Sequence, residues 1–273
     1  MTIVHRVIPV VLLDADGELK EPFSRGGMEI PYVESVCGFH ARDGADEVWL
    51  RLFEPGKKGV RSLFDPLKTI RPMVRVPLVV GGGIQSVSDA RLLIELGADR
   101  VIIDVGQVFE ETTTEASAES LEKILDFTSS VADAIGADAF TVSMSIRRLT
   151  ANPKVTWEII NAKGENTGFD AVHFAVELAN RGAGELVLGV EEEKGIVHDA
   201  EIVERLAELL HIQLVSLGEK RSLDEIAAPL LIGADAIASH GLFADGSYTV
   251  AAVKEKLRDF GAVTRPCIPP YSS

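Results

Sequence analysis

The chain has 273 residues, of which 46% are hydrophobic, and it carries a net charge of −15 at pH 7. This acidity argues against a nucleic-acid partner, because phosphate backbones are bound by basic surfaces. No run of about 18 apolar residues occurs, so a membrane partner is not expected. The first residues lack the apolar stretch of a signal peptide, and Cys37 and Cys267 have no metal-ligand spacing. We therefore expect a cytoplasmic protein without a metal or cofactor.

Short apolar runs alternate with amphipathic stretches along the whole chain. The runs have the length of buried parallel strands and occupy residues 7–13, 47–53, 77–80, 100–103, 139–145, 185–190, 212–217 and 236–239. The clearest helical periodicity falls at residues 88–96, 117–134, 170–181, 199–210, 222–231 and 249–259. Eight strands that alternate with helices predict an α/β fold, a closed (β/α)8 TIM barrel. A doubly wound open sheet is the alternative.

The chain also repeats itself at half its length. Residues 78–89 return in altered form at 214–224, and residues 97–99 return 136 residues later at 233–235. Two sequence segments that recur at the same spacing indicate a protein built from two similar half-barrels. This favours the closed barrel over the open sheet.

The repeat sets the expected organisation of the chain. The halves fall at about residues 1–135 and 136–261, and a C-terminal tail follows at 262–273. We expect residues 1–273 to form a single barrel domain. An insertion at 147–168 has the pattern of a small hairpin after the fifth strand.

Strand alternation decides which side chains face the barrel lumen. On the first strand, Arg6 and Asp14 share the inner face, and on the second strand Glu47 and Arg51 do. This register places Arg6 and Glu47 together at the amino ends of the strands, which we call the lower end of the barrel, where they can form an ion pair. Asp14 and Arg51 are expected near the carboxyl ends of the strands, where the active sites of such barrels lie.

Three consecutive glycines end the third strand and precede a predicted helix. Backbone N–H groups and the helix dipole can receive a phosphate there, so Gly82 and Gly83 are candidate phosphate-binding residues. The alternative is a tight turn without a ligand. The repeat keeps Gly218 but places Glu219 where a phosphate would lie, and the basic pair at 220–221 could compensate only by charge.

Several stretches together are specific for one family. They are residues 6–9, 43–47, 77–87, 97–101, 157–158, 166–168 and 181–186. Over nearly its whole length the chain resembles the cyclase subunit of imidazole glycerol phosphate synthase, in the histidine-biosynthesis barrel family. The resemblance implies a lyase, that is, a cyclase that acts on a phosphorylated small molecule. It also implies a glutaminase subunit, docked at the lower end of the barrel, that supplies ammonia.

In that family ammonia passes a charged gate built from one Arg, one Lys and two Glu. The matching positions here are Arg6, Glu47, Arg100 and Glu185. Only the lysine is replaced, by arginine, and the alternation of charge is kept. The resemblance therefore implies an ammonia gate. A charge layer that merely closes the barrel floor is the alternative.

The catalytic end departs from the family. The family uses two aspartates as general acid and base, at the ends of the first and fifth strands. The fifth-strand position is Ser145, which cannot shuttle protons near pH 7 without an activating base. The first-strand position is Leu12, or Asp14 if the strand carries two extra residues. Asp14 and Ser145 are thus the catalytic candidates, and a turn aspartate beside Asp16 is the alternative interpretation of Asp14.

The family's other phosphate contacts are also changed. Asp104 stands at the end of the fourth strand, where the family offers an amide and a hydroxyl, and a carboxylate there repels phosphate. Three glutamates at 191–193 follow the sixth strand and oppose an anionic ligand. After the eighth strand, Gly241 could still donate to phosphate, so Gly218 and Gly241 are the candidates of a second, poorer phosphate site beside the one at Gly82 and Gly83.

Four side chains are new candidates at the rim of this end: Arg51, Asp104, Arg147 and His198. Acidic residues near a histidine also suggest a metal site with the ligands Asp104, Glu191, Glu193 and His198. No regular ligand spacing supports that site, so a solvated acidic loop is the favoured interpretation and no metal is expected.

Three functional hypotheses remain. The first is a cyclase that acts on the family's bisphosphorylated ribonucleotide with a glutaminase partner. The second, which we favour, is a divergent enzyme of the family with another, less phosphorylated substrate. The third is a catalytically inactive barrel that binds or regulates a partner, and the loss of the fifth-strand aspartate favours it.

Overall fold

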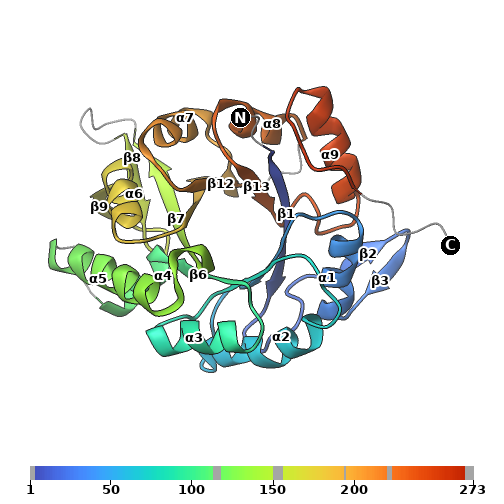
Figure 1. Ribbon diagram of the computed structural model, residues 1–273, viewed down its shortest axis with the longest axis horizontal. Helices are drawn as coiled ribbons and strands as arrows, with labels where there is room; N and C mark the ends of the chain where they lie inside the picture. The colour runs from blue at the N-terminus through green and yellow to red at the C-terminus, as the bar shows by residue number, and fades with distance from the viewer. Residues whose placement is uncertain (1–3, 113–117, 150–155, 194, 220–222, 268–273) are drawn as a thin grey trace.

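The computed structural model describes residues 4–112, 118–149, 156–193, 195–219 and 223–267. A ring of parallel strands lies at its centre, surrounded by helices (Figure 1). In order around the ring, the strands are β1 (Arg6–Leu13), β4 (Val48–Leu52), β5 (Leu78–Gly81), β6 (Arg100–Asp104), β7 (Phe140–Arg148), β10 (Glu185–Glu192), β12 (Gln213–Leu217) and β13 (Ala236–Ser239). Because β13 pairs in parallel with β1, the sheet closes on itself. The predicted barrel is confirmed, and the open sheet is wrong.

Helices cover the outer face of the ring (Figure 1). They are α1 (Val33–Arg42), α2 (Phe64–Ile70), α3 (Val87–Glu95), α4 (Val105–Thr112), α5 (Ala118–Ile135), α6 (Ala171–Asn180), α7 (Ala200–Leu209), α8 (Leu223–Ile232) and α9 (Val250–Asp259). Side-chain caps fix several starts, as where Ser86 accepts the N–H of Asp89 at the start of α3. The six predicted helices are confirmed to within one residue at each end. Over the described part of the chain, no helix is both long and apolar enough to cross a membrane.

The half-length repeat is visible in matching hydrogen bonds. Asp99 Oδ2 accepts the backbone N–H of Leu78 at 2.8 Å and so ties β6 to β5. In the second half, 136 residues further along the chain, Asp235 Oδ2 accepts the N–H of Leu214 at 2.8 Å and ties β13 to β12. The two halves therefore use equivalent residues for equivalent contacts.

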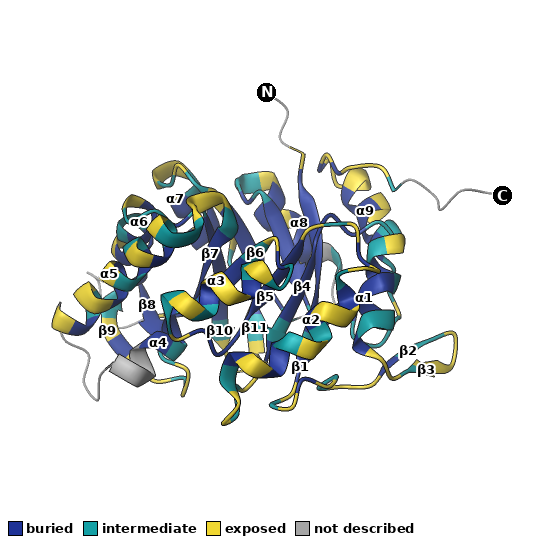
Figure 2. Ribbon diagram, turned by 60° about the horizontal axis from the view of Figure 1, so that its bottom comes forward, coloured by how far each residue is buried: buried dark blue, intermediate teal, exposed yellow. Residues whose placement is uncertain are grey.

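Two apolar layers lie on either side of the ring. The outer layer packs the strands against the helices, and the strands are almost wholly buried (Figure 2). The inner layer fills the lumen with Ile8, Val10, Trp49, Val79, Ile102, Val187, Val215, Leu217, Ala236 and Ala238. A packed lumen of this kind separates the two ends of the barrel.

Two strands of the ring, β7 and β10, extend past the others at their carboxyl ends and pair there with extra strands. β7 pairs with β8 (Trp157–Ile160), which pairs with β9 (Asn166–Asp170), so the predicted hairpin after the fifth strand is confirmed. β10 pairs with β11 (Gly195–Val197), and β2 (Phe23–Arg25) pairs with β3 (Met28–Ile30), neither of which was predicted. The first two additions build walls above the lumen.

Candidate functional site

Four charged side chains close the lower end of the lumen. Arg6 donates to Glu47 at 2.5 Å and to Glu185 at 2.6 Å, so the predicted Arg6–Glu47 pair is confirmed. Arg100 pairs with the same two carboxylates, with Glu185 at 3.2 Å and also with Glu47. Cations and anions thus alternate in a closed ring, which we call the charge ring.

The charge ring is buried and its members are held by further contacts. Glu185 is only 1% exposed and accepts the hydroxyl of Thr141 at 3.1 Å, while Trp49 Nε1 donates to Glu47 at 3.1 Å. Burial on its own lowers the pKa of Arg6, but the charges of Glu185 and Glu47 outweigh it and raise that pKa above its ordinary value. Buried charges persist only when they are paired, so each member of the ring depends on the others.

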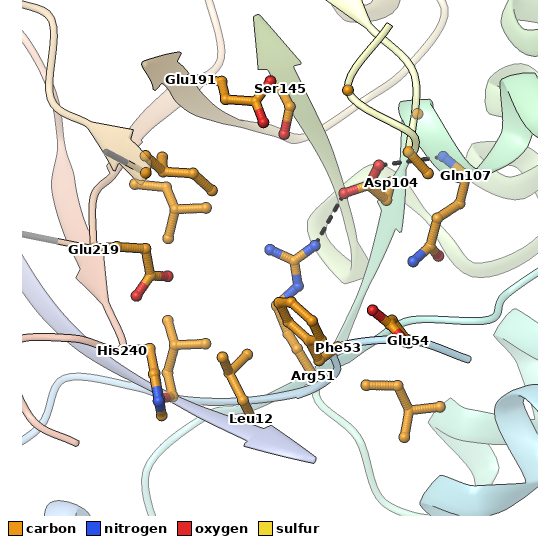
Figure 3. Close-up of a pocket in the computed structure, with 18 of the residues that line it drawn as sticks. Leu12, Arg51, Phe53, Glu54, Asp104, Gln107, Ser145, Glu191, Glu219 and His240 are labelled. Atoms are coloured by element: carbon orange, nitrogen blue, oxygen red, sulfur yellow. Dashed lines mark hydrogen bonds and ion pairs between the residues drawn. The ribbon is translucent and has the colours of Figure 1, made fainter. Parts of the chain in front are cut away.

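A cavity of about 510 Å³ opens at the opposite end of the lumen. Its base is apolar and includes Val10, Leu12 and Leu217. Its walls carry polar and charged groups (Figure 3), among them Lys20, Glu21, Arg51, Glu54, Asp104, Gln107, Ser145, Asn161, Glu191, Glu219 and His240. The cavity lies at the carboxyl ends of the strands, where barrels of this fold bind their ligands.

The first glycine turn is packed tightly against its neighbours. Gly82 and Gly83 have φ angles of +99° and +72°, which favour glycine. A Cβ atom on Gly82 would lie 2.7 Å from the Cβ of Leu52. The N–H of Gly83 donates to Oε1 of Gln107 at 3.2 Å, and neither glycine lines the cavity. Packing therefore accounts for these glycines without a ligand.

The second glycine turn also contacts groups of the protein. The N–H of Gly218 donates to the carbonyl of Ala238 at 3.1 Å, and the N–H of Gly241 donates to Oε2 of Glu219 at 3.0 Å. The carboxylate of Glu219 thus occupies the position expected for a phosphate. The basic pair at 220–221 lies outside the described residues. In the first half, the side chain of Gln107 accepts from the glycine turn, whereas in the second half the turn supplies the carboxylate of Glu219, which accepts from the loop after β13.

Comparison with known proteins identifies the family. The family model described as "Histidine biosynthesis protein" matches residues 31–248, which is most of the chain. The chain belongs to this histidine biosynthesis family. Similar relatives are the imidazole glycerol phosphate synthase subunits HisF of Dictyoglomus thermophilum and Dictyoglomus turgidum, 29% and 28% identical over 229 residues. Each alignment covers 83% of this chain and 84% of the relative, so the resemblance found in the sequence is confirmed.

The two positions at which the family is expected to carry aspartates hold other residues here. Leu12 and Ser145 both line the cavity. Asp14 lies beyond the end of β1, is exposed, and accepts the N–H groups of Asp16 at 2.9 Å and Glu18 at 3.1 Å. The expectation that Asp14 points into the barrel is wrong, because the chain turns after β1 and this carboxylate caps the turn.

The rim candidates divide into two groups. Arg51 and Asp104 form an ion pair of 3.1 Å in the cavity wall (Figure 3), with side chains 14% and 16% exposed. Arg147 instead binds Glu191 at 2.6 Å and the carbonyl of Gly164 at 3.0 Å. It therefore holds the β8–β9 hairpin against β10, rather than lining the cavity as predicted for a rim residue.

His198 lies behind the second glycine turn and is not among the residues that line the cavity. Its Nδ1 is 2.7 Å from the hydroxyl of Ser216, and its ring occupies the space that a Cβ on Gly218 would need. Of the other three ligands suggested for a metal, Asp104 and Glu191 are each paired with an arginine, and Glu193 is exposed. Within the described ranges, no three His, Cys, Asp or Glu side chains gather as a metal site.

A buried histidine lies next to the cavity wall. His40 is 3% exposed and lines a small cavity of about 20 Å³ together with His240. Three aromatic rings lie 5.4 to 5.8 Å from its own: Phe23, Phe39 and Phe243. Burial, with smaller contributions from the charges of His240 and Arg25, lowers the pKa of His40 to about 3. This side chain is therefore neutral throughout the ordinary pH range.

Sequence reasoning missed several wall residues. Lys20 lies over the ring of Phe53, 2.9 Å from its centroid, and both come from irregular loops in which no periodicity marks an inward side chain. Gln107 stands in the first turn of α4, three residues after Asp104. Its contact with the N–H of Gly83 joins residues 24 positions apart, so no local spacing in the sequence predicts it.

Proposed function

We propose that the protein is a divergent, imidazole glycerol phosphate synthase cyclase-like subunit that uses ammonia from a glutaminase partner in the cytoplasm. The observation that carries this proposal is the charge ring at one end of a lumen whose other end opens into a cavity. The names of the relatives, synthase subunits, agree with a chain that works beside a second protein.

The proposed route for ammonia follows the lumen from the charge ring to the cavity. Neutral ammonia can cross an apolar layer that excludes ions. In the closed ring, Arg100 is the member best suited to move, because its side chain is the most exposed of the four at 14%. Arg6 contacts both carboxylates, so Glu47 and Glu185 keep a cation while Arg100 swings aside.

The chemistry at the cavity depends on groups other than the family's aspartates. His240 is the best-placed proton carrier, with Nδ1 3.0 Å from the carbonyl of Val10 and Nε2 3.4 Å from Glu21. Imidazole commonly transfers protons near neutral pH. Ser145 stays in the proposal as a polar group that lines the same cavity, whereas Asp14 does not. A phosphorylated substrate stays a prediction that the two glycine turns do little to support.

An inactive barrel that binds or regulates a partner is the second candidate. It is favoured by one observation, the presence of Leu12 and Ser145 at the cavity positions where carboxylates are expected. An inert side chain and a hydroxyl cannot provide the general acid and base of the family reaction.

The test is incorporation of labelled ammonia. The purified protein is incubated with ¹⁵N-ammonium chloride and a small-molecule extract of the cells that express it, and products are analysed by mass spectrometry. A ¹⁵N-labelled product that requires folded protein supports ammonia use. No labelled product, from the extract or from the family's bisphosphorylated ribonucleotide, contradicts it and favours the inactive barrel.

A further inference from the structure

The hydrogen bonds of Gly83, in the first glycine turn, and of Gly241, in the loop after β13, bear on which ligand the cavity accepts. The N–H of Gly83 is engaged by Gln107 at 3.2 Å and that of Gly241 by Glu219 at 3.0 Å. A phosphate that used these donors would have to displace both side chains. Displacing Glu219 would also leave a carboxylate beside the incoming anion, which is unfavourable.

The charges of the cavity lining also disfavour a phosphate ligand. Five carboxylates line it, from Glu21, Glu54, Asp104, Glu191 and Glu219. Among the described lining residues, the lysine and the arginine both have partners already. Arg51 is paired with Asp104 at 3.1 Å, and the ammonium of Lys20 lies over the ring of Phe53. Glu191 is in turn paired with Arg147 at 2.6 Å. Within the described ranges, the carboxylates of Glu21, Glu54 and Glu219 have no arginine or lysine ion-pair partner, so these three give the lining its preference for positive charge.

The carboxylates are distributed over different walls. Figure 3 shows Glu191, Glu219 and Asp104 approaching the cavity from separate strands and loops, above an apolar base that includes Leu12. A ligand with a carbon skeleton and a protonated nitrogen group fits this arrangement, because ammonium and amidinium donors form short hydrogen bonds with carboxylates. A volume of about 510 Å³ suits a small molecule.

We infer that the cavity binds a phosphate-free ligand that carries a cationic amine or amidine group. Glu219 and Gln107 are its specificity residues, since their side chains take the amide donors that phosphate would need. The inference rests on the proposed function only in placing this ligand where ammonia is used. It concerns the identity of the ligand and not the source of the ammonia.

The first experiment titrates inorganic phosphate into the protein and follows the amide NMR signals of Gly83 and Gly241. The wild-type signals are expected to stay unchanged at millimolar phosphate. Glu219→Ala frees the N–H of Gly241, so phosphate affinity there should rise by about tenfold or more, as for one hydrogen bond to a charged group. Glu219→Gln keeps an acceptor on that N–H, and Glu21→Gln removes a carboxylate without freeing a donor, so neither should gain binding.

The second experiment compares two guanidines of similar length, agmatine and 4-guanidinobutanoate. Agmatine, with a cation at each end, is expected to perturb the cavity amides and to bind at least about tenfold more tightly. Its binding should weaken in Glu219→Gln and in Glu191→Gln.

Three results would overturn the inference: wild-type phosphate binding at Gly83 and Gly241, equal affinity for the two guanidines, or no effect of agmatine at 10 mM. None of these measurements involves ammonia. Failure here therefore leaves the ¹⁵N experiment to decide the proposed function separately.

Discussion

The two ends of the barrel use the same kinds of side chain in different surroundings. We call the end that holds the charge ring the floor and the end that holds the cavity the mouth. At the floor, Arg6 and Glu185 belong to a closed ring, and Glu185 is 1% exposed. At the mouth, Arg51 and Asp104 form a single pair, 14% and 16% exposed, beside an open cavity. The floor keeps the charge pattern expected of the family, whereas the mouth has lost the expected aspartates.

The difference follows from access to water. The carboxylates of the charge ring are 6% and 1% exposed, against 16% for Asp104. Neither of them can be changed alone, because the two arginines would then be left without full compensation. A charge beside a cavity can lose its partner and still be solvated. A barrel of this kind is therefore free to change its ligand at the mouth while the floor stays constant. The predictions below test this contrast, from the largest expected effect to the smallest.

Replacing one anion of the charge ring should have the largest effect. Glu185→Gln leaves Arg6 and Arg100 with one carboxylate between them, and we expect it to lower the free energy of unfolding by about 3–5 kcal/mol. Urea denaturation measures this loss. The matched control is Glu191→Gln at the mouth, where the side chain is 34% exposed and the loss should stay below about 1 kcal/mol. Equal losses in the two variants would remove the distinction between floor and mouth.

Acidification tests whether water reaches the ring of His40, which is buried beside the cavity wall. The pKa of His40 is lowered from 6.5 to about 3 by burial, so below pH 6.5 the unfolded chain binds a proton that the folded chain does not. The stability that neutral His40 contributes is complete above pH 6.5. It decreases by about 1.4 kcal/mol per pH unit toward pH 3.

Between pH 7 and pH 5, His40 should therefore remove about 2 kcal/mol from the free energy of unfolding. Unfolding by urea at the two pH values measures this loss. His40→Gln should abolish most of it, and His173→Gln, at an exposed position of α6, should not. A wild-type protein and a His40→Gln variant with the same pH dependence would show that water reaches the ring of His40.

Breaking the mouth pair should have the smallest effect. Arg51→Gln leaves Asp104 facing the cavity, where water can solvate the carboxylate, and we expect a loss of only about 0.5–1 kcal/mol in the free energy of unfolding. The same urea experiment measures it. A loss as large as that of Glu185→Gln would mean that the mouth is as dry as the floor.

The barrel and the charge ring were predictable because both depend on regular patterns. Eight apolar runs with helical stretches between them leave little choice of fold. Strand alternation brought Arg6 and Glu47 together at the floor, and they pair at 2.5 Å. The family resemblance added Arg100 and Glu185 to the same ring.

The mouth was harder to predict because its residues lie where strands end. Asp14 would face the lumen if β1 continued, but the strand ends at Leu13 and the carboxylate caps a turn. Arg147 was expected to follow the fifth strand at the rim, yet it lies on β7 and faces the added hairpin. The position of such side chains depends on loop conformation and tertiary contacts, which no period in the sequence encodes.

The charge ring also requires residues from both half-barrels. Its two arginines and Glu47 come from the first half of the chain, and only Glu185 comes from the second. In a barrel built from two copies of the first half, the ring would contain four cations and two anions. In a barrel built from two copies of the second half, it would contain two carboxylates and no cation. Electroneutrality at the floor is reached only by one half of each kind, so the symmetry of the repeat is broken where the barrel closes.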